Sequence, residues 1–338
     1  MREILLDLGM EQSKIEGALC LHVDDFLHAG SKSSDSHIMD KIRLRFQAGK
    51  KETRKFKYVG FNIDQGDNEV RIDQEEYVQK LEVPKMTAER KKQNEEPLTA
   101  EESTQLRAVV GGLNWISRGT RPDCSFEVVD TSMKLNNPIV ADLSRAIKAG
   151  IKVKTSPSLI TMPNLGKTEN WSLEVFTDAS RANMCDKIST ARGYLVFLAG
   201  ENGKTALLNW ECNKIQRVVK ATLSAEALGL CDGLSNAILI RSLLHEYLTL
   251  PYNSVPINAY VDNKSLIQAI QNPTAVSDDL LILDIAVVKE FMDQQRVNSI
   301  NWIPGNKQLV DSLTKRTASG IKLLKVIQTG RRIKDFYP

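Results

Sequence analysis

The chain has 338 residues, of which 42% are hydrophobic, so it is long enough for about two domains with substantial cores. The 45 Lys and Arg residues nearly balance the 42 Asp and Glu residues, and the formal net charge of +3 is too small to indicate nucleic-acid binding by itself. The five cysteines are scattered without a C-x-x-C pair, which argues against a disulfide framework and against a cysteine zinc site. No uninterrupted apolar run approaches the roughly 20 residues of a membrane span, and the first residues do not read as a signal peptide. We therefore expect an intracellular protein without a membrane partner.

The first predicted element is a hairpin with two acidic residues at its tip. A short apolar strand, Gly17–Val23, runs into Asp24 and Asp25, and Phe26–Gly30 returns. Two adjacent carboxylates repel each other unless a cation neutralises them, and a divalent metal ion is the natural partner. Taken alone, the pair is explained more simply as an Asp-Asp turn.

A helix and a basic segment follow this hairpin. Residues Asp35–Phe46 carry apolar side chains at a spacing of four, which predicts an amphipathic helix. The segment after it holds a one-sided excess of basic residues, among them Lys50, Lys51, Arg54 and Lys55. Such an excess indicates either contacts to nucleic-acid phosphates or a solvated face.

A second hairpin and a helix complete this part of the chain. We predict strands over Phe56–Ile63 and Glu69–Asp73, joined around Gly66, and a helix over Gln74–Leu81.

Residues 1–82 resemble a known family. The stretches LHVDDFL (21–27), YVGFNI (58–63) and IDQEEYVQKL (72–81) are similar to the palm of a copia-type LTR retrotransposon reverse transcriptase. The resemblance implies that Asp24 and Asp25 match the paired Asp residues of the polymerase metal site, although His22 stands where the family has an aromatic residue. That polymerase also needs an upstream third Asp and the fingers, which the few preceding residues do not supply. We therefore expect a truncated palm with a remnant polymerase metal site, and not a competent reverse transcriptase.

Residues 83–170 predict a linker followed by helices. Pro84–Pro97 is charged and irregular, and the helix after it opens with Thr99 and Glu102 in a capping-box pattern. Gly111 and Gly112 allow close packing within this helix, and the segment Thr120–Asp123 stops it. The stretch resembles the thumb and connection of the same family, and we see no catalytic constellation in it.

Residues 171–330 predict a mixed α/β sheet with helices packed on it, because three strands are followed by alternating helices and strands. The predicted strands are Leu173–Asp178, Gly193–Ala199, Ala206–Trp210, Ile257–Val261 and Ser299–Ile303. The predicted helices are Ser224–Leu248, Lys264–Ile270, Asp278–Gln294 and Leu309–Lys315.

Four carboxylates stand at the ends of these elements. Asp178 and Asp262 end two strands that chain direction allows to be neighbours, whereas Glu226 lies two residues after a Ser224 cap and Asp311 opens the last helix. A carboxylate at a helix start also has a purely structural explanation, because the helix N-terminus attracts negative charge.

A second resemblance connects these four residues. The blocks TDAS (177–180), LSAEA (223–227), VDNKS (261–265) and WIPGNKQLVDSLTK (302–315) are similar, in order and spacing, to the active-site blocks of a copia-type ribonuclease H domain. The resemblance implies that Asp178, Glu226, Asp262 and Asp311 are catalytic and hold two Mg²⁺ ions about 4 Å apart, with Mn²⁺ as an alternative. The implied reaction is endonucleolytic cleavage of RNA in an RNA–DNA hybrid.

The expected partner is therefore nucleic acid, and other segments of the same polyprotein are a second kind of partner. Serine and asparagine side chains beside the carboxylates can contact RNA 2′-hydroxyls or can simply form caps and turns; they are Ser180, Ser224, Asn263 and Ser265. The segment 278–284 is acidic and apolar where relatives of the family tend to be basic, which weakens the expected affinity for nucleic acid.

The sequence therefore leads to one main hypothesis and one alternative. The main hypothesis is a C-terminal part of a copia-type Pol polyprotein. Its α/β (α+β) fold comprises a partial palm (1–82), a helical thumb and connection (83–170) and a ribonuclease H-like mixed sheet flanked by helices (171–330). The alternative is a decayed, non-catalytic nucleic-acid-binding remnant. In either case we expect a cytoplasmic location, in a retroelement particle, or a nuclear one.

Overall fold

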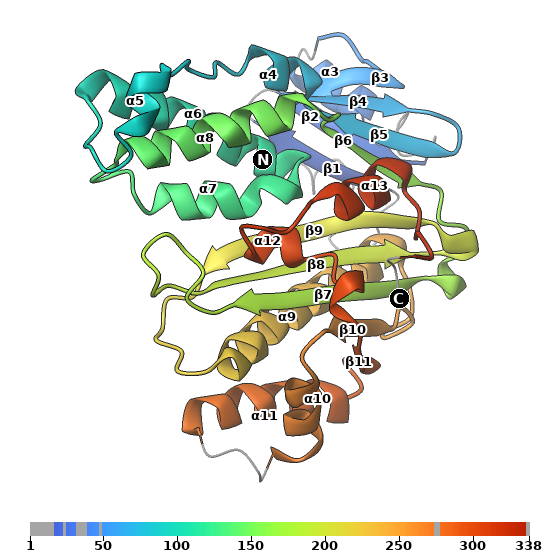
Figure 1. Cartoon of the computed structure of the whole chain (residues 1–338). Helices are drawn as coiled ribbons and strands as arrows, with labels where there is room; N and C mark the ends of the chain where they lie inside the picture. The colour runs from blue at the N-terminus through green and yellow to red at the C-terminus, as the bar shows by residue number, and fades with distance from the viewer. Residues whose placement is uncertain (1–16, 23–24, 32–38, 47–48, 274–277, 336–338) are drawn as a thin grey trace.

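The computed structural model describes residues 17–22, 25–31, 39–46, 49–273 and 278–335. Within these ranges the strands form three sheets of two, four and five strands, with helices between and around them (Figure 1).

The two-stranded sheet is the first predicted hairpin. Strands β1 (Gly17–His22) and β2 (Asp25–Gly30) pair antiparallel, which confirms the predicted strands. Asp25 begins β2 and is exposed, whereas Asp24 lies outside the described residues. Of the predicted helix at 35–46, the described part is α3 (Asp40–Phe46), which buries Ile42.

The four-stranded sheet corrects one prediction. The expected single strand Phe56–Ile63 is in fact two strands, β3 (Lys55–Tyr58) and β4 (Phe61–Gln65), paired antiparallel around a turn at Val59 and Gly60. Both turn residues have positive φ, 49° and 79°, as a two-residue hairpin turn of the primed type requires. Sequence reasoning missed the turn because a β-branched residue such as Val rarely adopts positive φ.

The other edge of this sheet comes from a distant part of the chain. Strand β5 (Glu69–Asp73) pairs with β4 on one side and with β6 (Leu159–Pro163) on the other, although residues 74–158 separate β5 from β6. No strand was predicted at 159–163. The stretch 83–170 thus shares a sheet with the stretch 1–82, and the predicted three-part division of the chain stays a prediction.

The residues between β5 and β6 are mainly helical. The elements are α4 (Glu75–Lys80), α5 (Ala88–Lys92), α6 (Ala100–Gly119), the 3₁₀ turn η2 (Pro122–Cys124), α7 (Ser125–Ser132) and α8 (Val140–Lys154). The predicted capping box is confirmed, since Thr99 and Glu102 accept each other's backbone N–H groups at the start of α6. The expected irregular linker contains α5, which the Arg90–Glu102 ion pair joins to α6.

The close packing predicted for the two glycines of α6 occurs at one of them. A Cβ at Gly112 would lie 2.4 Å from the Leu81 side chain, whereas nothing lies within 4 Å of a Cβ at Gly111. Gly112 therefore lets Leu81, the residue after α4, contact α6 directly. Leu81 belongs to a core that α6 shares with α7 and α8.

The five-stranded sheet confirms the predicted mixed topology. Its order is β11–β10–β7–β8–β9, with β7 parallel to β10, β10 parallel to β11, and β7, β8 and β9 antiparallel. The strands are β7 (Ser172–Ser180), β8 (Ala191–Ala199), β9 (Thr205–Lys214), β10 (Ile257–Val261) and β11 (Ser299–Trp302).

Helices cover both faces of this sheet, and each face has its own core (Figure 1). One face is covered by α9 (Thr222–Leu248), with α10 (Lys264–Gln271) and α11 (Asp279–Asp293) beside it. The other face is covered by α12 (Asp311–Thr314) and α13 (Ile321–Thr329) together with α7, whose Phe126 is buried in the same core.

Helix α9 is long and apolar enough, by composition alone, to cross a membrane. In this fold one side of it packs on β7, β8 and β10, and Leu230 and Leu234 are fully buried there. Its apolar character is therefore accounted for by the core that it covers.

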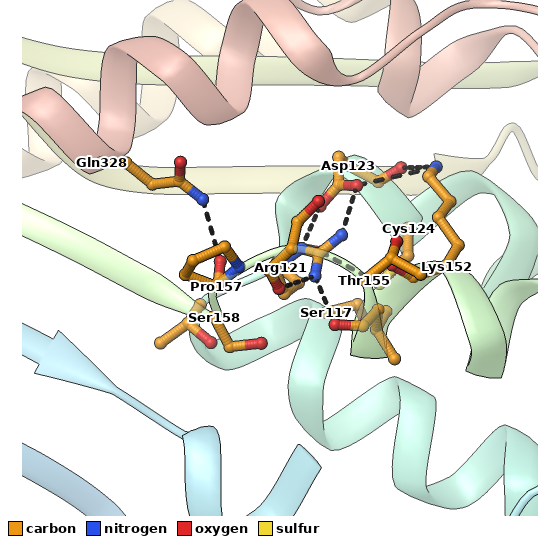
Figure 2. Close-up of polar contacts among 12 residues, drawn as sticks. Ser117, Arg121, Asp123, Cys124, Lys152, Thr155, Pro157, Ser158 and Gln328 are labelled. Carbon is orange, nitrogen blue, oxygen red and sulfur yellow. Dashed lines mark hydrogen bonds and ion pairs between the residues drawn. The ribbon is translucent and has the colours of Figure 1, made fainter. Parts of the chain in front are cut away.

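A buried polar network around Arg121 joins the end of α6 and η2 to α8 and the segment after it (Figure 2). Arg121 is fully buried, binds Asp123 through two hydrogen bonds of 2.8 and 3.0 Å, and donates to the carbonyls of Val153 and Ser156. Close by, Gln328 of α13 donates to the carbonyl of Pro157. The segment Thr120–Asp123, predicted only to end α6, therefore also anchors the following helices.

Candidate metal centre

Asp178 and Asp262 stand side by side because their strands are parallel neighbours. In the register of β7 and β10, Phe176 pairs with Tyr260, so the two aspartates two residues later reach the same edge of the sheet. Asp178 is only 1% exposed, and Asp262 is partly exposed. The predicted proximity of the two carboxylates is confirmed.

Asp311 joins them from the other side. It is the first residue of α12, as predicted, and one carboxylate oxygen from each of Asp178, Asp262 and Asp311 lies within 4.8 Å of the others. Gly193, opposite Asp178 on β8, makes this approach possible, because a Cβ there would lie 3.3 Å from Leu313 and 3.1 Å from Thr314. Helix α12 thus packs directly on the strand pair that carries Asp178.

Glu226 borders the same cleft but is not one of the three clustered carboxylates. Helix α9 begins at Thr222 rather than at a Ser224 cap, so Glu226 lies one turn inside the helix and is 4% exposed. Burial, followed by the charges of Asp178 and Asp262, raises the pKa of Glu226 to about 9. Its Oε2 atom has no hydrogen-bond partner within the described part of the chain.

Asp262 and Asp311 share this electrostatic strain, because the pKa of each is raised as well. Burial raises the pKa of Asp311 to about 6, with Asp178 adding to the rise and Lys315 opposing it. Burial and the charge of Asp178 also raise the pKa of Asp262. These shifts have one physical cause, which is that several negative charges are held close together away from water.

A lysine that sequence reasoning did not single out lies among these carboxylates. The Nζ atom of Lys315 is 2.6 Å from Asp311 Oδ1, 3.3 Å from Asp178 Oδ1 and 4.0 Å from Asp262 Oδ2. Burial lowers the pKa of Lys315, but the three surrounding aspartates outweigh burial and raise it overall. The i, i+4 spacing of Asp311 and Lys315 was the one signal in the sequence, because residues so spaced meet on a helix.

Two neutral side chains hold Asp178 and its strand in place. The hydroxyl of Thr314 donates to Asp178 Oδ2, and Nε2 of the buried Gln308 donates to the carbonyl of Thr177 at 3.0 Å. Both come from the segment around α12, so the same segment supplies Asp311 and orients Asp178.

Helix α7, which precedes the five-stranded sheet in the chain, supports the segment around α12 as well. Arg316, next to Lys315, binds the buried carboxylate of Asp130 in α7 at 2.7 Å. Asp130 also accepts the backbone N–H of Cys185, in the loop between β7 and β8. One buried acid of α7 therefore holds two segments that flank the carboxylates.

Asp178, Glu226 and Asp262 line a cleft of about 610 Å³, together with Lys315. Of the predicted nucleic-acid contacts beside the carboxylates, Ser180 and Asn263 line this cleft. Ser224 is buried inside α9 and Ser265 is exposed on α10, and neither is among the described residues that line it. Further cleft-lining residues, which sequence reasoning did not propose as contacts, are Arg181, Thr222, Lys264 and Trp302.

Asn263 and Trp302 shape the rim of the cleft. Asn263 caps α10 by accepting the backbone N–H of Leu266. The Trp302 ring is 43% exposed, lies 4.3 Å from the Lys264 ammonium, and donates to the carbonyl of Asp262. The exposed face of an aromatic ring beside a cation suits stacking on a base or sugar.

The predicted basic contacts lie on another part of the molecule, at and before β3. Lys50, Lys51, Arg54 and Lys55 are all exposed. Three of them form ion pairs on the same surface, which join Lys50 to Glu52, Arg54 to Asp67 and Lys55 to Asp64. These acids reduce the local positive charge, and the role of the four residues in nucleic-acid binding stays a prediction.

The residues of the centre fit a hard divalent cation. Asp178, Asp262 and Asp311 offer only oxygen ligands, and the unpaired Oε2 atom of the buried Glu226 is a further oxygen beside them. Mg²⁺ and Mn²⁺ prefer such ligands, and a cation in this position would relieve the repulsion that raises the carboxylate pKa values.

Comparison with known proteins adds fold similarity only. No protein family model matches the sequence. The chain is 18% identical, with a TM-score of 0.32, to the N-terminal RNase H domain of rv2228c from Mycobacterium tuberculosis, covering 46% of this chain and 96% of that one. LC11-RNase H1, solved in complex with an RNA/DNA hybrid, is 17% identical to the chain with a TM-score of 0.32. The match covers 42% of this chain and 94% of that one.

A longer viral protein is also similar. The protease–reverse transcriptase of prototype foamy virus is 11% identical with a TM-score of 0.30, and the match covers 59% of this chain and 28% of that chain. At these identities and TM-scores no family is established for the chain, and the sheet order and carboxylate positions described above are properties of this chain itself.

Proposed function

We propose that this protein cleaves the RNA strand of RNA–DNA hybrids endonucleolytically, with Mg²⁺ held by Asp178, Glu226, Asp262 and Asp311. The observation that carries the proposal is the meeting of three carboxylates from β7, β10 and α12 at one point, beside the buried Glu226, whose Oε2 atom has no hydrogen-bond partner among the described residues. Asp178, Glu226 and Asp262 line an open cleft. The same four residues stand in the four ordered sequence blocks that resemble a copia-type ribonuclease H.

Each residue has a defined task in this reaction. Bound divalent ions would activate the attacking water and stabilise the leaving 3′ oxygen of the cleaved strand. Asp178, fixed by Thr314, is the best positioned ligand, and Asp262 and Asp311 face it from the strand and the helix beside it. Glu226 brings a further carboxylate from the wall formed by α9.

The substrate class follows from the resemblance and suits the cleft. Discrimination of RNA from DNA requires contacts to 2′-hydroxyl groups, and we propose that Ser180 and Asn263, two of the polar residues that line the cleft, make them. We propose Trp302 as a stacking surface beside them. The wider proposal, that the chain derives from a copia-type Pol polyprotein, rests on the sequence resemblance of its blocks.

Hybrid cleavage tests the proposal directly. The full chain is incubated with a labelled RNA–DNA hybrid, the same RNA single-stranded, and the matching DNA duplex, with Mg²⁺ and with a chelator. We expect internal cuts in the RNA of the hybrid alone, only with metal, and their loss in Asp262→Asn. The matched control is Asp293→Asn at the exposed end of α11, which should cleave like the parent.

A non-catalytic, nucleic-acid-binding protein is the second candidate. The observation that favours it is the acidic segment 278–284, where Asp284 pairs with Arg217 and so removes a basic group from the surface. Salt-dependent hybrid binding without cleavage in Mg²⁺ or Mn²⁺ would support this candidate and overturn the first.

A further inference from the structure

The carboxylate centre contains a positive charge of its own. The Lys315 ammonium contacts Asp311 and Asp178 and reaches 4.0 Å from Asp262, so it faces the same three carboxylates that cluster within 4.8 Å of one another. A cation that satisfies these oxygens would have to share the space between them with the ammonium.

The backbone around Lys315 is fixed, whereas its side chain has room to move. Thr314 is held by its bond to Asp178, and Arg316 is held by Asp130. The Lys315 backbone N–H donates to the carbonyl of Asp311 at 2.8 Å. The Lys315 side chain itself is 34% exposed and lines the cleft, so its four-carbon stem can swing toward solvent without disturbing the fold.

We infer that Lys315 is a tethered cation that balances the carboxylates in the metal-free protein and competes with a divalent ion for them. The inference rests on the proposed function only in taking these carboxylates as the metal-binding site. Removing the ammonium would leave Asp178 buried beside other carboxylates without a counter-charge, which is costly in the metal-free state. The same removal would leave the oxygens free for a metal ion, so metal binding would tighten.

Two substitutions at one position test this competition. Lys315→Met removes the charge and keeps the apolar stem, and Lys315→Gln removes the charge but keeps a donor for Asp311. The control is Lys325→Met on the exposed side of α13. Far-UV circular dichroism first establishes that each variant is folded, and the Gln variant carries the test if the Met variant is not.

The readouts are thermal unfolding of the chelator-treated protein and calorimetric titration with Mg²⁺ and Mn²⁺. We expect both Lys315 variants to melt several degrees below the parent without metal and to bind Mg²⁺ about tenfold or more tightly, because a charge close to the ligands has been removed. The Lys325 variant should match the parent in both measurements.

Equal or weaker Mg²⁺ affinity in the Lys315 variants would overturn the inference. If the parent binds Mg²⁺ and cleaves hybrid while the Lys315 variants bind Mg²⁺ as the parent does, the inference alone fails. If neither the parent nor the variants bind Mg²⁺ or Mn²⁺, the proposed function fails with it. Binding that appears only in the Lys315 variants would support the inference in its strongest form.

Discussion

The chain offers two sets of acidic residues that sequence motifs connect with metal ions, and the fold treats them very differently. Asp25 is exposed at the start of a strand in a two-stranded sheet. Asp178 is 1% exposed on the central strand of a five-stranded sheet, with Asp262, Asp311 and Glu226 around it. The difference shows that a motif becomes a site where several elements bring their carboxylates to one buried point.

The physical reason lies in how the carboxylates are supplied. Adjacent residues on one extended strand point to opposite faces, so a pair such as 24 and 25 depends on its turn to converge. Carboxylates from separate elements converge because packing fixes the elements, and the apolar cores on both faces of the five-stranded sheet provide that rigidity. Burial then raises their repulsion and with it the benefit of binding a cation.

The largest effect is expected at the buried centre. Asp178→Asn removes a ligand charge worth several kcal/mol of transition-state stabilisation, so hybrid cleavage should fall about 10³-fold or more. Single-turnover cleavage rates with the parent and the variant measure this loss, and circular dichroism confirms folding. Cleavage within a few-fold of the parent would contradict the role given to Asp178.

A second prediction concerns the buried ion pair between Arg121 and Asp123, at the start of η2. Arg121→Met leaves Asp123 buried with Lys152, at 3.6 Å, as its one remaining ion-pair partner among the described residues, and should lower the free energy of unfolding by about 3 to 5 kcal/mol. Urea unfolding of the parent and the variant measures this loss of unfolding free energy. Helix α12 packs on η2, so cleavage should fall in parallel.

The matched control for this substitution is an exposed pair. Arg71→Met breaks the ion pair with Glu69 on β5, where both side chains are at least a third exposed, and should cost less than about 0.5 kcal/mol. A similar loss in the two variants would contradict the importance given to burial.

A smaller effect is expected where α7 supports the centre. Asp130→Asn removes the charge that binds Arg316 and should cost about 1.5 kcal/mol, the value of a hydrogen bond to a charged group. The unfolding free energies of Asp130→Asn, Arg316→Gln and the double variant form a cycle. If the losses of the two single variants simply add in the double variant, Asp130 and Arg316 are not coupled. That result would contradict the stabilising role given to their ion pair.

The smallest effect is expected at the exposed hairpin. Asp25→Asn should change the unfolding free energy by less than about 0.5 kcal/mol, as exposed substitutions usually do, and should leave hybrid cleavage unchanged. Denaturant midpoints and cleavage rates of the variant measure both. A marked loss of cleavage would show that the hairpin takes part in the reaction. It would contradict the distinction drawn between the exposed Asp25 and the buried carboxylates.

Much of the fold was readable from local patterns. The capping box at Thr99 and Glu102, the hairpin of β1 and β2, and the mixed order of strands and helices after residue 171 all follow from signals a few residues long. The parallel direction of two predicted strands was enough to place Asp178 beside Asp262. These features need no knowledge of distant contacts.

Other features had no local signal. Val59 adopts a positive φ in the turn between β3 and β4, and β6 pairs with β5, from which residues 74–158 separate it. Phe126 of α7 enters the core of the five-stranded sheet, although sequence analysis assigned that sheet and its helices to residues 171–330. Each of these depends on contacts between segments that sequence spacing does not relate.

The sequence by itself determined which residues of the candidate centre are acidic, and on which strands and helices they lie, because hydrophobic periodicity and capping act over short distances. Only the tertiary structure decided that three of the four carboxylates cluster tightly and that Lys315 supplies a cation among them. It also decided that Glu226 is buried beside them with its Oε2 atom unpaired within the described part of the chain. Those outcomes depend on how α9 and α12 pack against the central strands, which is a balance of long-range contacts.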